Sequence, residues 1–142
     1  MIRKMETADL EQVCAIETLC FSVPWTRAVF QDSLSREEYL YFVAVSEGQI
    51  AGYCGLLMIG EEGDVVNVAV HPDWRKQGIG ENMLETLLQA GHEKGISAFT
   101  LEVRVGNTAA IHLYEKTGFV PVGVRRGYYE KPQEDALIMW KR

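Results

Sequence analysis

The segment Val68-Ala69-Val70-His71-Pro72-Asp73-Trp74-Arg75-Lys76-Gln77-Gly78-Ile79-Gly80 carries more information than any other stretch of this chain. An apolar run of strand type leads into a short loop, and the pattern R-x-x-G-x-G then opens an amphipathic helix. Glycines at a helix start let a ligand approach the backbone closely, and the free amides of the first turn favour an anion. The segment therefore predicts a strand–loop–helix unit suited to a phosphate or pyrophosphate, with a plain tight turn as the alternative.

Outward from this segment, the hydrophobic periodicity predicts eleven elements in the order β-α-α-β-β-β-α-β-α-β-β. The predicted strands are 1–5, 39–45, 50–59, 64–70, 99–103, 119–126 and 135–140, and the predicted helices follow Thr7, Thr26, Gly78 and Asn107. Antiparallel pairing early in the chain and a strand–helix–strand unit in its middle predict a mixed α/β sheet with helices on both faces. No repeat or linker divides the chain, so residues 1–142 are expected to form a single domain.

Local signals support the predicted boundaries. Thr7, Thr26 and Asn107 are residues of N-cap type, and Trp25 with Phe30 matches a hydrophobic staple. Glu47-Gly48-Gln49 between two apolar runs predicts a hairpin, and the strand 64–70 is apolar enough to be central in the sheet. Gly95 and Gly118 are expected just beyond the ends of two helices.

Composition and charge narrow the class of protein. With 47% apolar and 24% charged residues, the chain is of ordinary globular composition, and it has no apolar run long enough for a membrane span or a secretion leader. Residues 1–64 carry four basic and eleven acidic side chains, which argues against nucleic acid and suits a basic partner. Cys14, Cys20 and Cys54 form no C-x-x-C pattern, which favours a reducing cytoplasm.

Several familiar motifs are absent. Met83 stands where a dinucleotide fingerprint needs a third small residue, and no phosphate-loop motif with a lysine exists. His71, His92 and His112 lack metal-ligand spacing, so no metal is expected. Cys54 lies in a predicted strand and is expected to be a buried, unreactive thiol.

The motifs that the chain does contain resemble those of the GCN5-related N-acetyltransferases over nearly its whole length. Within that family it is similar to the bacterial branch that acetylates the N-terminal alanine of ribosomal protein eighteen of the small subunit. The resemblance rests on combined stretches: Phe21–Thr26, Val66–Val70, the R-x-x-G-x-G segment, Leu101–Arg104, Asn107–Glu115, Gly118-Phe119 and Arg125–Tyr129. It implies a central twisted sheet, and acetyl-CoA as co-substrate without a metal.

The resemblance also implies roles for individual residues. Main-chain groups of Val68, Ala69 and Val70 would hold the acetyl and pantetheine end of acetyl-CoA. The turn from Lys76 through Gln77, Gly78, Ile79 and Gly80 to Glu81 would bind the pyrophosphate, with Arg75 at its entrance. Asn107 would bind the pantetheine arm, or serve only as a helix cap. Glu102 would be the general base and Tyr114 the general acid; the alternatives are a solvent-facing carboxylate and a packing aromatic ring.

Acid–base chemistry favours an α-amine as the acceptor. Deprotonating an α-amine at pH 7 costs roughly 1 kcal/mol, whereas a lysine costs roughly 4–5 kcal/mol, so one carboxylate suffices for the former. Together with this cost, the resemblance implies acetylation of a protein N-terminus, with a peptide groove bordered by Phe21–Trp25 and Tyr128–Tyr129. A small-molecule amine or a lysine is the alternative acceptor, and a non-catalytic acyl-CoA-binding module is the alternative without chemistry.

Overall fold

One seven-stranded sheet takes up strands from nearly the whole chain. The computed structural model describes residues 1–142 and gives the strand order β1-β2-β3-β4-β5-β7-β6. The strands are β1 (Ile2–Lys4), β2 (Tyr39–Ser46), β3 (Gln49–Ile59), β4 (Glu62–Val70), β5 (Ala98–Arg104), β6 (Val120–Tyr129) and β7 (Glu134–Lys141). The helices are α1 (Leu10–Cys20), α2 (Arg27–Leu34), α3 (Ile79–Glu93) and α4 (Thr108–Lys116), with short 3-10 turns at Thr7–Asp9 and Pro72–Trp74.

The sheet is mixed, as the order of elements predicts. Strands β1 to β4 pair in antiparallel fashion, β4 and β5 are parallel, and β7 pairs antiparallel with both β5 and β6. The predicted central position of the strand 64–70 is confirmed, because β4 is the fourth of the seven strands. Its parallel partner β5 is reached through α3, which gives the strand–helix–strand unit.

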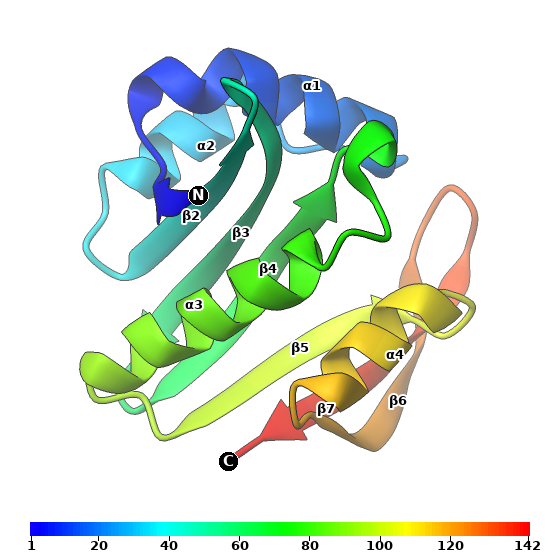
Figure 1. The fold of residues 1–142 in the computed structure, drawn as a ribbon. Helices are drawn as coiled ribbons and strands as arrows, with labels where there is room; N and C mark the ends of the chain where they lie inside the picture. The colour runs from blue at the N-terminus through cyan, green and yellow to red at the C-terminus, as the bar shows by residue number, and fades with distance from the viewer.

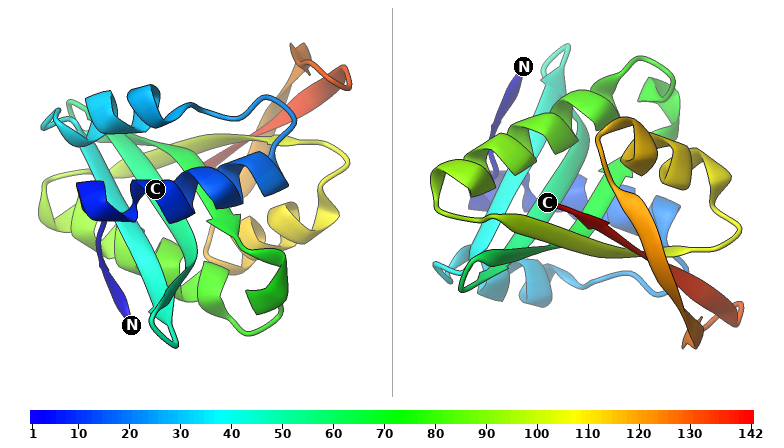
Figure 2. Two further views of the ribbon diagram at one scale, coloured as in Figure 1. Left: turned by 90° about the horizontal axis from the view of Figure 1, so that it is seen from above. Right: turned by 90° about the horizontal axis from the view of Figure 1, so that it is seen from below.

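Helices cover both faces of the sheet, as predicted (Figures 1 and 2). On one face α3 packs with Met83, Leu84 and Leu87 against side chains from the middle of the sheet, and Tyr114 of α4 belongs to the same apolar cluster. On the other face Leu10, Val13 and Ile16 of α1 and Phe30 of α2 form a second cluster, which includes Tyr41 and Tyr53. The two clusters define the α3 face and the α1 face of the sheet.

The start of the first helical segment differs from the expectation. Thr7 does not cap it; Thr7 is the first residue of the 3-10 turn, and Glu6 precedes that turn as its cap. The Glu6 amide donates to Asp9 Oδ2 at 2.8 Å, and both Asp9 oxygens accept from the Arg3 guanidinium at 2.8 Å. The charged partner Arg3 thus makes Asp9, and not Thr7, the residue that closes this turn.

The other local signals are confirmed. Thr26 Oγ1 accepts from the Val29 amide at 3.3 Å, and the rings of Trp25 and Phe30 lie 5.4 Å apart. The β2–β3 hairpin turns at Glu47 and Gly48, both with positive φ. Gly95 and Gly118 have φ of +94° and +103° just beyond α3 and α4, where the left-handed conformation ends a helix.

Candidate active site

Strands β4 and β5 separate after a short stretch of pairing. They are hydrogen-bonded neighbours only from Glu62 to Asp64 on β4 and from Ala98 to Thr100 on β5. Beyond that point β4 stays paired with β3, and β5 stays paired with β7 up to Arg104. Figure 1 shows the two strands diverging toward their carboxyl ends. One edge of β4 therefore has no strand partner over its second half.

The ladder decides which main-chain groups of β4 face this open edge. The His71 amide donates to the Ala51 carbonyl at 2.8 Å, and Val70 lies opposite Gly52. By the alternation of an antiparallel ladder, Ala69 exchanges hydrogen bonds with Tyr53, while the groups of Val68 and Val70 point away from β3. The main-chain groups of Ala69 are thus engaged with β3, whereas Val68 and Val70 have groups toward the open edge. The contact predicted for all three residues stays a prediction.

Arg75 lies against the end of β4. Its Nε donates to the Val70 carbonyl at 3.1 Å, and its Nη2 lies 3.3 Å from Cys20 Sγ at the end of α1. The guanidinium thus joins three segments of the chain and occupies the Val70 carbonyl. Among the groups at the open edge, this leaves the Val70 amide and both main-chain groups of Val68 for a ligand.

The turn before α3 has the geometry of an anion site. Gly78, the N-cap, has φ of +79°, and no side chain caps the helix. The Asn82 amide donates to the Gly78 carbonyl at 3.0 Å, so the amides of Ile79, Gly80 and Glu81 precede the first intrahelical bond. Lys76 also has a positive φ, of 64°, which is uncommon for a residue with a side chain. These free amides and the positive end of the helix dipole suit a pyrophosphate.

Gly80 and Glu81 connect this turn to α4. A Cβ on Gly80 would lie 3.3 Å from Leu113 Cδ2 of α4 and 3.6 Å from Val70 Cγ2 of β4. The Glu81 carboxylate pairs with Lys116 Nζ at 3.3 Å, which draws its negative charge toward α4. The absence of a side chain at Gly80 therefore lets α3 pack closely against α4 and β4, and Glu81 is placed to contribute its amide.

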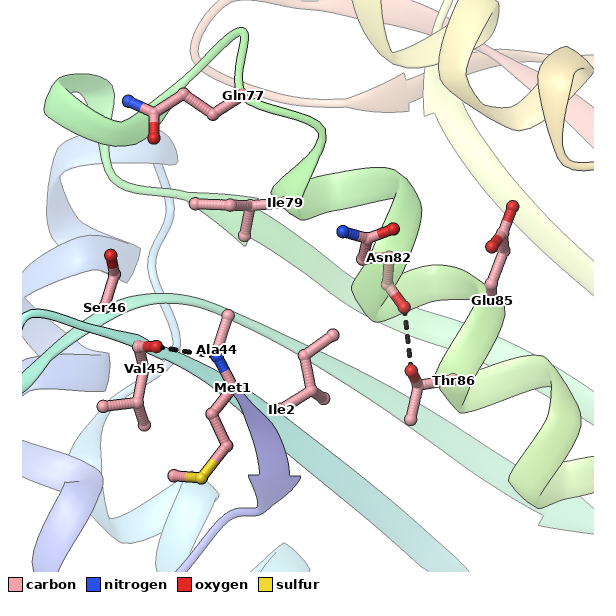
Figure 3. Close-up of a pocket in the computed structure, with 10 residues that line it drawn as sticks. All are labelled: Met1, Ile2, Ala44, Val45, Ser46, Gln77, Ile79, Asn82, Glu85 and Thr86. Atoms are coloured by element: carbon pink, nitrogen blue, oxygen red, sulfur yellow. Dashed lines mark hydrogen bonds between the residues drawn. The ribbon is translucent and has the colours of Figure 1, made fainter.

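Gln77 and Ile79 lie on the side of the turn that faces β2 and the start of the chain. With Asn82 they line a pocket of about 540 Å³ whose opposite wall is the start of the chain and Ala44–Ser46 of β2 (Figure 3). The Met1 amino group donates to the Val45 carbonyl at 3.0 Å within this wall. The pocket contains neither Glu102 nor Tyr114, so it is separate from the predicted chemistry.

Asn107 caps α4, as one of its two expected roles requires. Its Oδ1 accepts from the Ala110 amide at 3.2 Å, and the residue is exposed. The predicted contact with a pantetheine arm uses the remaining amide nitrogen and stays a prediction.

Glu102 lies on the α1 face of β5. Its neighbours Leu101 and Val103 are buried in the apolar cluster of the α3 face, so the alternation of the strand turns Glu102 the other way. The side chain is 21% exposed, and Glu102 Oε1 lies 4.0 Å from Arg125 Nε on β6. Glu102 is thus neither a freely solvated carboxylate nor a tightly paired one, which suits a group that must accept a proton.

Tyr114 lies on the α3 face. Its ring packs against Phe119 with centroids 5.9 Å apart, and its hydroxyl makes no hydrogen bond within the chain. Burial raises the pKa of the phenol above its ordinary value, and the nearby Tyr129 and Cys54 raise it further. Because Cys54 lies opposite Val68 in the sheet, Tyr114 is near the part of β4 with free main-chain groups. Packing explains the ring, but not the unpartnered hydroxyl.

Glu102 and Tyr114 therefore approach the separation of β4 and β5 from opposite faces of the sheet. A nucleophile deprotonated on the α1 face can attack an acyl group held along β4, and the leaving group on the α3 face can take a proton from the phenol. Cys54, by contrast, is fully buried, and burial raises the pKa of its thiol to about 12, as expected for an unreactive residue.

Two structural anchors near the site were not predicted. Glu17 of α1 is 2% exposed and accepts from the Trp25 amide at 2.9 Å, from the Tyr53 hydroxyl and from Asn67 Nδ2 at 3.5 Å. Arg104 of β5 donates to Ser22 and to the Glu130 carbonyl, and its guanidinium lies 4.5 Å from the Tyr129 ring centroid. The sequence offered one sign of the role of Glu17, which is an acidic residue on the apolar face of α1. For Arg104 it offered only the Leu101–Arg104 stretch of the resemblance.

The open edge of β4 and the glycine-containing anion turn that follows it form a site that can bind an extended donor with a phosphate group. The chain matches the acetyltransferase (GNAT) family over residues 10–119 and belongs to that family. It is therefore an acetyltransferase, and acetyl-CoA is the acyl donor. The open edge of β4 and the free amides before α3 fit the amide-containing arm and the pyrophosphate of that donor.

Individual relatives are similar over almost their full length. The [ribosomal protein bS18]-alanine N-acetyltransferase of Escherichia coli (strain K12) is 36% identical over 140 residues, which cover 97% of this chain and 94% of that protein. The corresponding Haemophilus influenzae protein is 33% identical, with coverages of 98% and 96%. The crystal structure of the Escherichia coli ribosomal-protein-S18-alanine N-acetyltransferase gives a TM-score of 0.91 at 36% identity, covering 99% of this chain and 92% of that one.

No helix of the chain combines the length and the apolar character needed to cross a bilayer. No group of three His, Cys, Asp or Glu side chains is arranged to hold a metal ion.

Proposed function

We propose that this chain transfers the acetyl group of acetyl-CoA to the N-terminal α-amine of a protein, and that the acceptor is the N-terminal alanine of ribosomal protein bS18. The observation that carries the chemistry is the placement of Glu102 and Tyr114 on opposite faces of the sheet where β4 leaves β5. The relatives of known name act on that alanine, which supports the choice of acceptor. Residues 1–142 act as one domain in this proposal.

In the proposed reaction, Glu102 takes a proton from the acceptor amine, directly or through water. The neutral nitrogen attacks the thioester carbonyl carbon, so that a C–N bond forms. As the C–S bond breaks, the thiolate takes its proton from Tyr114, the nitrogen loses its second proton to water, and water returns a proton to the Tyr114 phenolate. The raised pKa of Tyr114 keeps the phenol protonated at neutral pH, so the proton is present when the thiolate leaves. Val68 and Val70 would hold the pantetheine end, and Lys76–Glu81 the pyrophosphate.

The charge of the chain supports a basic acceptor. Residues 1–64 carry an excess of seven acidic side chains, which attracts a basic protein tail and repels nucleic acid. A reducing cytoplasm, where such an acceptor is made, also suits the three free cysteines.

Mass spectrometry of products from a panel of acceptors tests the proposal. The panel contains a basic peptide that begins with alanine, the same peptide with a blocked N-terminus and an internal lysine, and a polyamine. We expect acetylation of the first peptide at its α-amine, and a KM that increases between about 0.05 M and 0.3 M salt because screening weakens the attraction. Modification of the lysine peptide or the polyamine alone would replace the proposal with the alternative acceptor class.

A further inference from the structure

Asp64 occupies the last position at which β4 and β5 are paired. It lies opposite Thr100, two residues before Glu102 on β5. Its neighbours on β4 turn to the α3 face: a Cβ on Gly63 would meet Leu56, Ile96 and Phe99, and Val65 is buried in that cluster. Asp64 therefore points to the α1 face, the same face as Glu102.

The Asp64 carboxylate has an oxygen that nothing satisfies. Oδ1 is shielded from solvent and has no hydrogen-bond partner, and it is the one buried side-chain oxygen or nitrogen in the chain of which this is true. A buried, unpartnered carboxylate oxygen destabilises a fold and calls for a functional explanation. Packing does not provide one, because an apolar side chain of similar size would remove the penalty.

Asp64 and the proposed base Glu102 have the same charged neighbours. The pKa of Asp64 is raised to about 6, chiefly by burial and also by the nearby Glu102, while Arg125 of β6 acts in the opposite direction. The pKa of Tyr128, also on β6, is raised in part by both carboxylates, so its phenol faces the same two groups. Asp64 and Glu102 therefore lie in one charged neighbourhood on the α1 face, which also contains the Arg125 guanidinium.

We propose that Asp64 is a positioning residue that acts through Glu102, so that the two carboxylates hold the proton released by the acceptor amine as a coupled pair. A carboxyl with a like charge on the same face of the sheet resists ionisation, so Asp64 keeps a proton more readily beside Glu102 than it would alone. An N–H bond of the amine breaks and its proton passes to Glu102, the C–N bond forms at the thioester carbon, and the C–S bond breaks to release the thiolate, which Tyr114 protonates. This inference rests on the proposed function for its acceptor.

Kinetic measurements on Asp64→Asn test the pair. The variant keeps the size of the side chain and removes one negative charge, so we expect kcat to fall about tenfold with an unchanged dissociation constant for acetyl-CoA. The part of the acidic limb of the kcat/KM profile that falls near pH 6 is expected to disappear, because the Asp64 carboxyl no longer titrates there. Asp32→Asn, on the exposed outer surface of α2, is the matched control and leaves both quantities unchanged.

The result that overturns the inference is a folded Asp64→Asn enzyme with the kcat and the acidic limb of the parent. A readout without turnover separates this failure from failure of the proposed function: carbon NMR of the Asp64 carboxyl as a function of pH. We expect its midpoint near pH 6 to move lower in Glu102→Gln, whichever amine is the acceptor. An unmoved midpoint shows that the two carboxylates are independent and rejects the pair.

Discussion

Glu102 and Tyr114 differ in what surrounds the atom that must exchange a proton. The Glu102 carboxylate is partly exposed beside Arg125, whereas the Tyr114 ring is packed among the apolar side chains of the α3 face. The first environment leaves the Glu102 carboxylate accessible to an approaching amine. The second keeps a phenol neutral, which is the form that donates.

Replacing Glu102 by glutamine is expected to lower kcat by roughly 100-fold, because the amide cannot accept the amine proton. Acetyl-CoA affinity should be unchanged, since Glu102 lies on the face opposite the proposed pantetheine site. Steady-state kinetics with the alanine peptide and calorimetric titration of acetyl-CoA measure the two quantities. Glu115→Gln, an exposed change on α4, serves as the control. A parent-like kcat in Glu102→Gln would assign that carboxylate to the surface.

Replacing Tyr114 by phenylalanine removes a hydroxyl that makes no hydrogen bond, so the fold should lose little stability. We expect kcat to fall about tenfold or more across the range from about pH 7 to pH 9, because the raised pKa keeps the phenol protonated throughout it. A pH–rate profile of both enzymes checks this. If the variant has the kcat of its parent, Tyr114 only packs against Phe119.

At the scale of elements, the first turn of α3 depends on the backbone of Gly78. Alanine at Gly78 would be strained at φ of +79°, although no atom lies within 4 Å of its Cβ. Gly95, beyond the other end of α3, has φ of +94° and equally open surroundings, which makes Gly95→Ala a matched control. Both changes should destabilise the fold by about 1 kcal/mol.

Only the first of these two glycine variants is expected to weaken acetyl-CoA binding, by at least about tenfold or 1.4 kcal/mol, because it displaces the amides of the anion turn. Titration calorimetry on both folded variants makes the comparison. Equal affinities in Gly78→Ala and Gly95→Ala would place the pyrophosphate elsewhere.

The segment between α1 and α2 is held by Glu17. The Trp25 amide, the Tyr53 hydroxyl and the Asn67 amide all donate to this one carboxylate, which ties the segment to β3 and β4. Because Phe21–Trp25 is expected to border the acceptor groove, Glu17→Gln should raise the KM of the peptide several-fold and cost about 1–3 kcal/mol of stability. The dissociation constant of acetyl-CoA should not change in Glu17→Gln, and the exposed control Glu11→Gln should keep the peptide KM of the parent. If Glu17→Gln also has the peptide KM of the parent, Glu17 has no role in acceptor binding.

At the scale of the whole molecule, two aspartates give stability opposite dependences on pH. The pKa of Asp9 is lowered, chiefly by its hydrogen bond from Arg3, so its contribution is present at neutral pH and is lost in acid as the carboxyl takes up a proton. The pKa of Asp64 is raised to about 6, so the folded chain binds a proton there that the unfolded chain does not. The stability that this bound proton gives to the folded chain is lost as the pH rises from about 4 to above 6.

Urea unfolding at about pH 5 and pH 8 distinguishes the two aspartates. Asp64→Asn should be more stable than its parent at pH 8, with a smaller gain at pH 5, where the folded parent carries a largely neutral Asp64. Asp9→Asn should be less stable at both pH values, because Arg3 loses its partner in either case. A destabilised Asp64→Asn at pH 8 would mean that the ionised carboxylate is satisfied in the folded chain.

Much of this protein follows from its sequence alone. The order of elements, the helix end at Gly95, the caps at Thr26 and Asn107 and the glycine turn before α3 are encoded within a few residues, because periodicity and capping are local properties. The cap at Thr7 was wrong because its competitor, the Arg3–Asp9 pair, is formed by side chains that the local pattern does not weigh.

The tertiary structure decided what lies opposite what. Strand register and contacts between distant segments decide three features of the site. β4 leaves β5 after Asp64, the main-chain groups of Ala69 lie in the ladder with β3, and Arg75 covers the Val70 carbonyl. The same contacts place Glu102 and Asp64 on one face and Tyr114 on the other. Local sequence could not give this, because sheet pairing is a long-range property and a shift of one residue would turn each side chain to the other face.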